Sequence, residues 1–183
     1  MRAEDRRDHL LDVAARLVVA DGTAALSVER LAEAAGVSKA LPYKHFANAE
    51  DVLVALYRRE TALLGRAVWR ALSAAGPADD LVRLSVRTYF DELVARGPLL
   101  AALSSPGASV PVLADPGSVG VRFSIDVLQR FHGLDRRRAK VVGGMVQGAI
   151  VGAADTWSRR AAPRRALEDA LVAMIRTAIA TPD

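Results

Sequence analysis

Side chains that can donate hydrogen bonds or carry positive charge gather within residues 38–45 of this sequence. A serine and a tyrosine hydroxyl, two lysine ammonium groups and a histidine ring are all groups that bind phosphate oxygens. Two apolar side chains lie between them, and small apolar groups of this kind can contact the methyl group of thymine. The residues concerned are Ser38, Lys39, Ala40, Leu41, Tyr43, Lys44 and His45. This combination predicts contact with the backbone and the base edges of DNA.

The elements that would position these groups are two short helices joined at Gly36. Ser27 is a favourable N-cap for the first helix, which we expect to end just before that glycine. Two alanines near its end are small enough to let a neighbouring helix approach, and Gly36 permits a tight turn. The second helix is expected over residues 39–46, with Ser38 as its N-cap. This is the geometry of a helix-turn-helix, whose second helix enters the major groove.

Further helices are expected on both sides of this motif. Apolar residues recur at helical spacing over residues 4–20, and charged residues lie opposite them. Asn48, followed three residues later by Asp51, resembles a capping box and opens a long helix that continues toward Leu72. The motif is therefore predicted to lie between an amphipathic helix and a long connecting helix.

Residues 5–57 as a whole resemble the N-terminal domain of the tetracycline-repressor (TetR) family. The resemblance lies in the first helix, in the stretch DGTAALSVERLAEAAGVSK, in the cluster of Tyr43, His45 and Phe46, and in residues 50–57. It implies an all-helical fold of about nine helices, a divergent C-terminal ligand domain, and homodimers that release DNA when a small molecule binds. It also implies a phosphate contact for His45. The DNA-binding residues expected on this basis are Ser27, Ser38, Lys39, Ala40, Leu41, Tyr43, Lys44 and His45.

Two residues depart from the usual pattern of that family. Pro42 occupies a position where a larger apolar residue is common, and Ala49 one where a phosphate-binding lysine often opens the fourth helix. Counted from a cap at Ser38, Pro42 is the fourth helical residue, so it removes the first regular backbone hydrogen bond. An interior proline can cost about 3 kcal/mol, and we expect less near a helix start. We expect the two residues to affect which operator sequence is recognised and how tightly phosphate is bound. They do not change the predicted fold.

The distribution of charge gives little support to DNA binding by itself. The chain of 183 residues has a formal net charge of +4. Residues 1–60, however, hold nine Lys and Arg against ten Asp and Glu, so the positive excess lies in the C-terminal part. The prediction of DNA binding therefore depends on the geometry of the motif.

The rest of the chain is also expected to be helical, which makes the fold all-α. One predicted helix ends at Gly97-Pro98, and the prolines and glycines of residues 104–118 predict a loop. The helices expected after the long connecting helix cover residues 79–96, 99–103, 119–132, 135–160 and 163–180. We expect a helix-turn-helix DNA-binding domain at residues 1–47 and a helical ligand-binding and dimerisation domain at residues 48–183.

Wide apolar stripes on the last two predicted helices need partners. In the resembling family such helices form a four-helix bundle across a two-fold axis, and a helix-turn-helix dimer places its reading heads about 34 Å apart. Gly144, Gly148 and Gly152 follow at four-residue intervals, so backbones can approach closely on that face. The alternative is that the stripes pack inside one subunit. The dimer-interface residues expected are Val146, Ile150, Ala153, Trp157, Leu167, Leu171, Met174, Ile175 and Ala178.

A ligand pocket would be walled by side chains from separate helices of the C-terminal part. Pockets are themselves mostly apolar, so sequence does not distinguish their residues from ordinary core. Few charges fall among them, which favours a hydrophobic or weakly polar effector. The long connecting helix joins both domains, and its tilt would change the separation of the recognition helices. The ligand-binding residues expected are Trp69, Tyr89, Phe90, Leu93, Leu103, Phe123, Val127, Met145 and Gln147.

Two alternatives compete with a ligand-responsive transcriptional repressor. An enzyme is disfavoured because the three histidines are far apart and the sequence has no His-Glu-x-x-His motif, phosphate loop or nucleophile elbow. A helical small-molecule-binding protein with impaired DNA binding is suggested by Pro42, Ala49 and the near-neutral N-terminal part. No metal or cofactor is expected.

The sequence also bears on the cellular compartment. It contains no cysteine, which excludes disulfides and cysteine-based zinc sites. The charged N-terminus lacks the pattern of a secretory signal. The longest apolar run, residues 141–154, is shorter than the roughly 20 residues that a bilayer span needs. We therefore expect a cytoplasmic location without membrane association.

Overall fold

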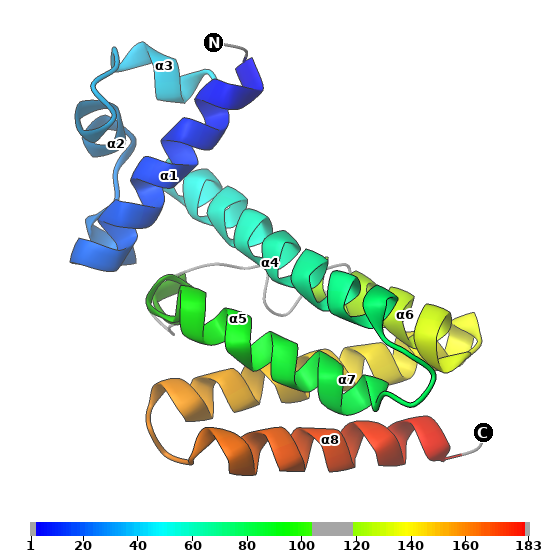
Figure 1. The fold of residues 1–183 in the computed structure, drawn as a ribbon. Coiled ribbons are helices and arrows are strands. Elements are labelled where there is room, and N and C mark those ends of the chain that lie inside the picture. The colour runs from blue at the N-terminus through cyan, green and yellow to red at the C-terminus, as the bar shows by residue number, and fades with distance from the viewer. Residues whose placement is uncertain (1–2, 104–118, 182–183) are drawn as a thin grey trace. The chain divides into compact units, whose positions relative to one another are not determined.

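The computed structural model describes residues 3–103 and 119–181 (Figure 1). Within these ranges the chain is all-helical, as predicted, with eight α-helices, one 3-10 helix and no strand. The loop expected at residues 104–118 lies outside the described residues. The elements are α1 (Ala3–Asp21), η1 (Thr23–Ala25), α2 (Val28–Ala34), α3 (Ala40–Tyr43), α4 (Ala49–Ala74), α5 (Leu81–Leu103), α6 (Val119–His132), α7 (Arg136–Ser158) and α8 (Arg164–Ala180). None of these helices is long and apolar enough to cross a lipid bilayer.

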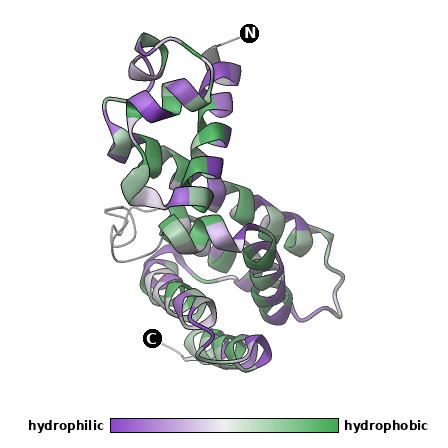
Figure 2. Ribbon diagram, turned by 90° about the vertical axis from the view of Figure 1, so that its left-hand side faces the viewer, coloured by the Kyte–Doolittle hydropathy of each residue, from purple (hydrophilic) through white to green (hydrophobic). Residues whose placement is uncertain are grey.

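The chain forms two compact units whose borders fall inside helices. The first unit runs to Glu60 and includes the chain again from Pro98, while the second begins at Thr61 and includes α6, α7 and α8. α4 and α5 therefore each contribute to both units. Most helices carry one hydrophobic and one hydrophilic stripe, and this pattern is visible along the ribbon in Figure 2. Each unit is stabilised by burial of the hydrophobic stripes.

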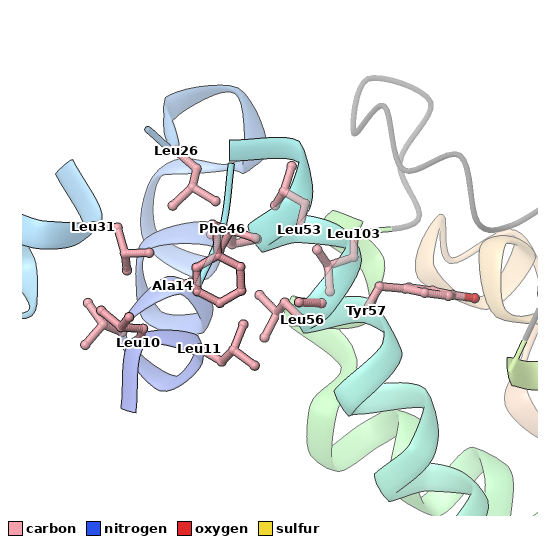
Figure 3. Close-up of a cluster of buried hydrophobic side chains, with 14 of the residues drawn as sticks. Leu10, Leu11, Ala14, Leu26, Leu31, Phe46, Leu53, Leu56, Tyr57 and Leu103 are labelled. Atoms are coloured by element: carbon pink, nitrogen blue, oxygen red, sulfur yellow. The ribbon is translucent and has the colours of Figure 1, made fainter. Parts of the chain in front are cut away.

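The core of the first unit is made by α1, α2, α4 and the end of α5. Leu10, Leu11 and Ala14 of α1 are fully buried, and their side chains gather with Phe46 and Leu56 in Figure 3. Complete burial of a leucine or phenylalanine side chain contributes about 1.5–3 kcal/mol. This cluster thus fixes the helices on which the predicted motif depends.

The second unit is held together by close helix contacts and by ion pairs. Gly143 of α7 lies against Ile125 of α6, and a Cβ atom at this glycine would approach the Ile125 Cγ1 to 2.9 Å. Three arginine–aspartate pairs join α8 to α5 or to the residue just before it. They are Arg83–Asp169, Arg164–Asp91 and Arg176–Asp80. The first two have N···O distances of 2.8 and 2.6 Å. Apolar contact therefore fixes α7 on α6, and charged pairs align α8 with α5.

α5 corrects one prediction made from the sequence. The expected helix end at Gly97-Pro98 and the separate helix at 99–103 are wrong, because α5 continues through Pro98 to Leu103. An interior proline costs about 3 kcal/mol. Three leucines that follow it, Leu99, Leu100 and Leu103, are buried, and each contributes about 1.5–3 kcal/mol. Burial after the proline outweighs the missing backbone hydrogen bond.

The last three helices lie where the sequence predicted them. α6 has the predicted bounds, and α7 ends two residues before the predicted position. The carboxylate of Asp135 caps α7 by accepting from the backbone N–H groups of Arg137 and Arg138 at 2.7 and 3.1 Å. These bonds favour the ionised carboxylate, so they hold the pKa of Asp135 below its usual value.

Candidate nucleic-acid interface

The turn at Gly36 has the conformation that the sequence predicts. Gly36 has a φ of +65°, in the left-handed region that glycine adopts without strain. Its backbone N–H donates to the Glu33 carbonyl at 3.1 Å, and that of Val37 donates to the Ala32 carbonyl at 3.0 Å. This pair of bonds is the Schellman motif, which ends a helix sharply. α2 therefore stops at this point and the chain turns into α3.

Ser27 caps α2, as predicted. Its Oγ accepts a hydrogen bond from the backbone N–H of Arg30 at 3.1 Å. The Arg30 guanidinium in turn donates to the Ala25 carbonyl at 3.2 Å and pairs with Asp21 at 2.7 Å. These contacts connect the start of α2 to the end of α1. The Ser27 side chain also makes a hydrogen bond to the Glu29 carboxylate, which contributes to lowering the pKa of Glu29.

α3 is shorter than predicted, and its cap differs. The helix covers Ala40–Tyr43 rather than residues 39–46. The prediction of Ser38 as N-cap is wrong, because Lys39 occupies that position and makes no side-chain cap bond. The Ser38 carbonyl accepts the first turn bond instead, from Leu41 at 2.9 Å. The start of α3 thus has backbone N–H groups without a side-chain cap, which favours an anion nearby.

Pro42 fits α3 without losing a helical hydrogen bond. It is the third helical residue, and the first N–H groups of a helix have no intrahelical partner in any case. Its ring is fully buried, and its carbonyl accepts from His45 and Phe46 at 2.9 Å each. Pro42 is therefore a buried residue on the inner side of α3, which explains why the departure is compatible with the fold.

The residues predicted to contact DNA are mostly on the outer surface of the motif. Ser38, Lys39, Ala40 and Lys44 are exposed, and Tyr43 is 48% exposed. The remaining three, Leu41, His45 and Ser27, are half-buried. Phe46 is buried under the motif. The motif thus exposes cationic side chains and hydroxyl donors on its outer surface, and apolar side chains are buried beneath them.

One contact in this surface was not predicted from the sequence. The Tyr43 hydroxyl of α3 donates to the Glu29 Oε1 of α2 at 2.5 Å. This bond is the main cause that lowers the pKa of Glu29, and it raises the pKa of Tyr43. Glu29 lies in the first turn of α2. A pair separated by fourteen residues gives no periodic signal, so only the folded turn reveals it.

α4 begins with the predicted capping residues. The Asn48 Oδ1 accepts from the backbone N–H of Asp51 at 2.9 Å. The Asp51 carboxylate accepts a hydrogen bond at 3.0 Å from the backbone N–H of Ala47, the residue before the cap. Ala49 is the first residue of α4, so it leaves this helix start without a basic side chain.

Basic residues of two other helices lie beside His45. A surface hollow in the first unit is lined by Arg7 of α1 and by Arg58 and Arg59 of α4, together with His45. The Arg7 guanidinium lies 5.3 Å from the centre of the Phe46 ring, a cation–π distance. Arg59 is engaged with Asp12 at 2.7 Å. The sequence analysis did not select these arginines, because they come together only through the packing of α1 on α4.

The predicted ligand-binding residues do not all line one pocket in the structure, because they differ in burial and belong to different compact units. Phe90, Leu93 and Val127 are buried in the second unit, and Tyr89, Phe123 and Gln147 are half-buried there. Leu103 belongs instead to the hydrophobic core of the first unit. Met145 is 64% exposed and Trp69 is 36% exposed. In a single subunit Met145 thus faces solvent more than core, whereas the Trp69 ring packs edge-on against the Phe131 ring, with the ring centres 5.1 Å apart.

The predicted dimer residues divide in a similar way. Ala153, Leu171 and Ile175 are buried within the subunit, whereas Met174 is 57% exposed. The other five, Val146, Ile150, Trp157, Leu167 and Ala178, are half-buried. The stripes therefore pack partly inside one subunit, and apolar groups remain at their outer edge.

These elements define a helix-turn-helix unit followed by a helical unit. Residues 10–56 match the sequence profile of the bacterial regulatory proteins of the tetR family. An HTH-type transcriptional regulator of Mycobacterium tuberculosis is 34% identical over 55% of this chain and 50% of its own length. The HTH-type transcriptional activator FasR of Mycolicibacterium smegmatis is 27% identical over 84% of this chain and 73% of its own. A TetR transcriptional regulator from Rhodococcus sp. RHA1 has the same fold, with 16% identity, a TM-score of 0.72 and 97% of each chain covered.

This chain resembles the tetR family of bacterial regulatory proteins over residues 10–56. It spans about half the length of the M. tuberculosis relative. The match of residues 10–56 includes α2, the turn at Gly36 and α3. The likeness of the second unit to solved structures concerns the fold alone.

Proposed function

We propose that this chain is a ligand-responsive transcriptional regulator that binds double-stranded operator DNA as a homodimer and acts in the cytoplasm. The observation that carries the proposal is the exposed surface of α3 beyond the Gly36 turn, with Lys39, Tyr43 and Lys44 outward. The functional division is a DNA-binding domain at residues 1–47 and an effector and dimerisation domain at residues 48–183. A two-fold dimer implies an operator with inverted half-sites.

The regulator is proposed to be a repressor that leaves its operator when a small, mainly hydrophobic molecule binds. Support comes from the apolar character of Phe90, Leu93 and Val127 in the second unit. An effector acts only through different affinities for the DNA-competent and DNA-incompetent shapes of the dimer. α4 belongs to both compact units, so its tilt is the proposed connection. The name of FasR, a transcriptional activator, makes activation the alternative outcome.

The dimer face is proposed on α7 and α8. Val141 and Met145 of α7 are 63% and 64% exposed, and Met174 of α8 is exposed as well. Gly144, Gly148 and Gly152 are exposed on α7, and a Cβ at any of them would meet no atom of the subunit within 4 Å. Large exposed apolar side chains beside open glycine positions suit close approach by a second copy.

A gel shift or footprint on DNA that flanks the protein's own gene tests the proposal. Sequence-selective binding that weakens steeply with salt is expected, because Lys and Arg contacts release counterions from DNA. A second candidate function, a small-molecule-binding protein with impaired DNA binding, is favoured by Ala49 and by the near-neutral N-terminal part. Binding with no preference over random DNA would favour that candidate.

Lys44 offers a sharper test of the phosphate contacts. Lys44→Ala should weaken binding to all duplexes about equally and reduce the salt slope by about one, because a phosphate contact is independent of sequence. Fluorescence anisotropy at several salt concentrations measures both quantities. A loss of affinity confined to one base position would contradict the phosphate role of Lys44.

A further inference from the structure

The Tyr43 hydroxyl already has an acceptor inside the protein. It donates to the Glu29 Oε1 at 2.5 Å, from α3 to α2. A tyrosine hydroxyl carries one hydrogen, so it donates to one acceptor at a time. A phosphate oxygen that takes this hydrogen bond must therefore displace the Glu29 carboxylate.

The bond is not needed to hold α3 against α2. The Schellman bonds at Gly36 fix the turn, and the buried side chains of Leu31, Pro42 and Phe46 fill the space beneath it. Glu29 and Tyr43 are both exposed, and exposed polar pairs contribute little to stability. The contact thus has little structural value where it stands.

The negative charge of Glu29 opposes DNA binding by the surface on which it lies. The hydrogen bond from the Tyr43 hydroxyl is the main cause that lowers the pKa of Glu29. Its own backbone N–H, the Ser27 side chain and the nearby Lys39 lower this pKa further, so the carboxylate is ionised at neutral pH. A carboxylate and a phosphate oxygen are both anionic acceptors, and they repel one another. In the free protein, the Tyr43 hydroxyl thus donates to an anionic oxygen of Glu29. A phosphate of DNA would offer an anionic oxygen of the same kind.

We propose that Glu29 is an internal competitor of the DNA backbone, which holds the Tyr43 hydroxyl in the free protein and yields it to a phosphate oxygen when DNA binds. This inference rests on the proposed DNA-binding function. It assigns to Glu29 a role in limiting affinity for DNA of any sequence, because the displaced contact is to the backbone. Removal of the carboxylate then strengthens DNA binding, although it deletes a hydrogen bond from the protein.

The test compares Glu29→Ala with Glu33→Ala in wild-type and Tyr43→Phe backgrounds. Glu33 is a matched control, because it is an exposed glutamate one turn further along α2, whereas the Tyr43 hydroxyl donates to Glu29. The probe is a fluorescently labelled random-sequence duplex, since the contact is independent of sequence. Glu29→Ala should tighten binding about three- to tenfold more than Glu33→Ala does. In the Tyr43→Phe background the two substitutions should have equal effects.

A second readout needs no DNA. Spectrophotometric titration should show that the raised pKa of Tyr43 falls toward 10.0 in Glu29→Ala, with Tyr43→Phe identifying its signal among the other tyrosines. An unchanged pKa, an equal gain from Glu33→Ala, or a gain that persists without the Tyr43 hydroxyl would overturn the competitor role. A wild-type protein without salt-dependent binding to the duplex would instead overturn the proposed function.

Discussion

The helix-turn-helix and the second unit differ in how locally their structures are determined. Around Gly36, each backbone bond of the turn and each cap joins residues three to five positions apart. In the second unit, the pairs that align α8 with α5, such as Arg83–Asp169 and Arg176–Asp80, join residues far apart in sequence. Local bonds leave a pattern in the sequence, whereas distant pairs do not. The turn at Gly36 and the helix caps around it are therefore the part of the backbone that a sequence describes best.

Burial of Leu31 should matter most for the stability of the helix-turn-helix. Leu31 of α2 is fully buried, so Leu31→Ala should reduce the free energy of unfolding by about 2–5 kcal/mol and abolish DNA binding. Urea unfolding followed by circular dichroism measures the loss. Glu33→Ala in the same helix is the control and should change stability by less than about 0.5 kcal/mol. Equal effects of the two changes would show that local bonds alone hold the motif.

The second prediction concerns the outer face of the second unit. Met145→Glu should weaken dimerisation about a hundredfold, because an unpaired carboxylate would be buried between two copies. Val94→Glu is the control, since Val94 of α5 is also about half exposed but lies off the proposed face. Sedimentation equilibrium measures the dimer constant. Similar losses in both variants, or none in either, would remove the dimer face from α7.

Close packing of α7 against α6 in the second unit should also contribute to stability. Gly143→Ala should reduce the free energy of unfolding by about 1–3 kcal/mol, because the new Cβ would meet the Ile125 side chain at 2.9 Å and its backbone N at 3.2 Å. Gly65→Ala should cost less, since it meets only the Phe123 ring, at 3.1 Å, and a ring can shift. Urea unfolding of both variants gives the comparison. The reverse order would contradict the contact of α6 with α7.

The smallest expected effect is a pH dependence of the second unit. Burial lowers the pKa of His132 below 6.5, so the unfolded chain binds a proton more readily than the folded one. This residue therefore favours unfolding as pH falls from about 7 through the lowered pKa, and the effect vanishes above that range. Urea unfolding of wild type and His132→Gln at pH 5.5 and 7.5 should show a smaller loss in the variant. A loss of the same size in both would exclude His132 as the source.

The sequence predicted the helices and the turn because their causes are local. Ser27, Gly36 and Asn48 each act within one turn of a helix, and their effects were predicted from type and spacing. The same local rules misplaced the end of α5, because Pro98 is a helix breaker by local preference only. Burial of the leucines after it, which depends on α1 and α4, decides the outcome.

The candidate site was predicted less completely than the fold. Local pattern placed Lys39, Tyr43 and Lys44 on the exposed side of the motif. It did not bring Glu29 to Tyr43 or Arg7 to Phe46, since those contacts require two helices to be packed first. For the same reason apolar periodicity put Leu103 and Met145 in one pocket, whereas the former lies in the core of the first unit and the latter is exposed.

The central claim is that α3, turned outward at Gly36, enters DNA twice in each dimer. The chain contains no cysteine, so Ala40→Cys provides one attachment point for a photo-crosslinker on α3, and Ser73→Cys provides one on the exposed end of α4. We predict efficient crosslinking from position 40 to two sites about one helical turn apart in the operator, and little from position 73. No crosslinking from position 40, or equal crosslinking from both positions, would contradict the claim.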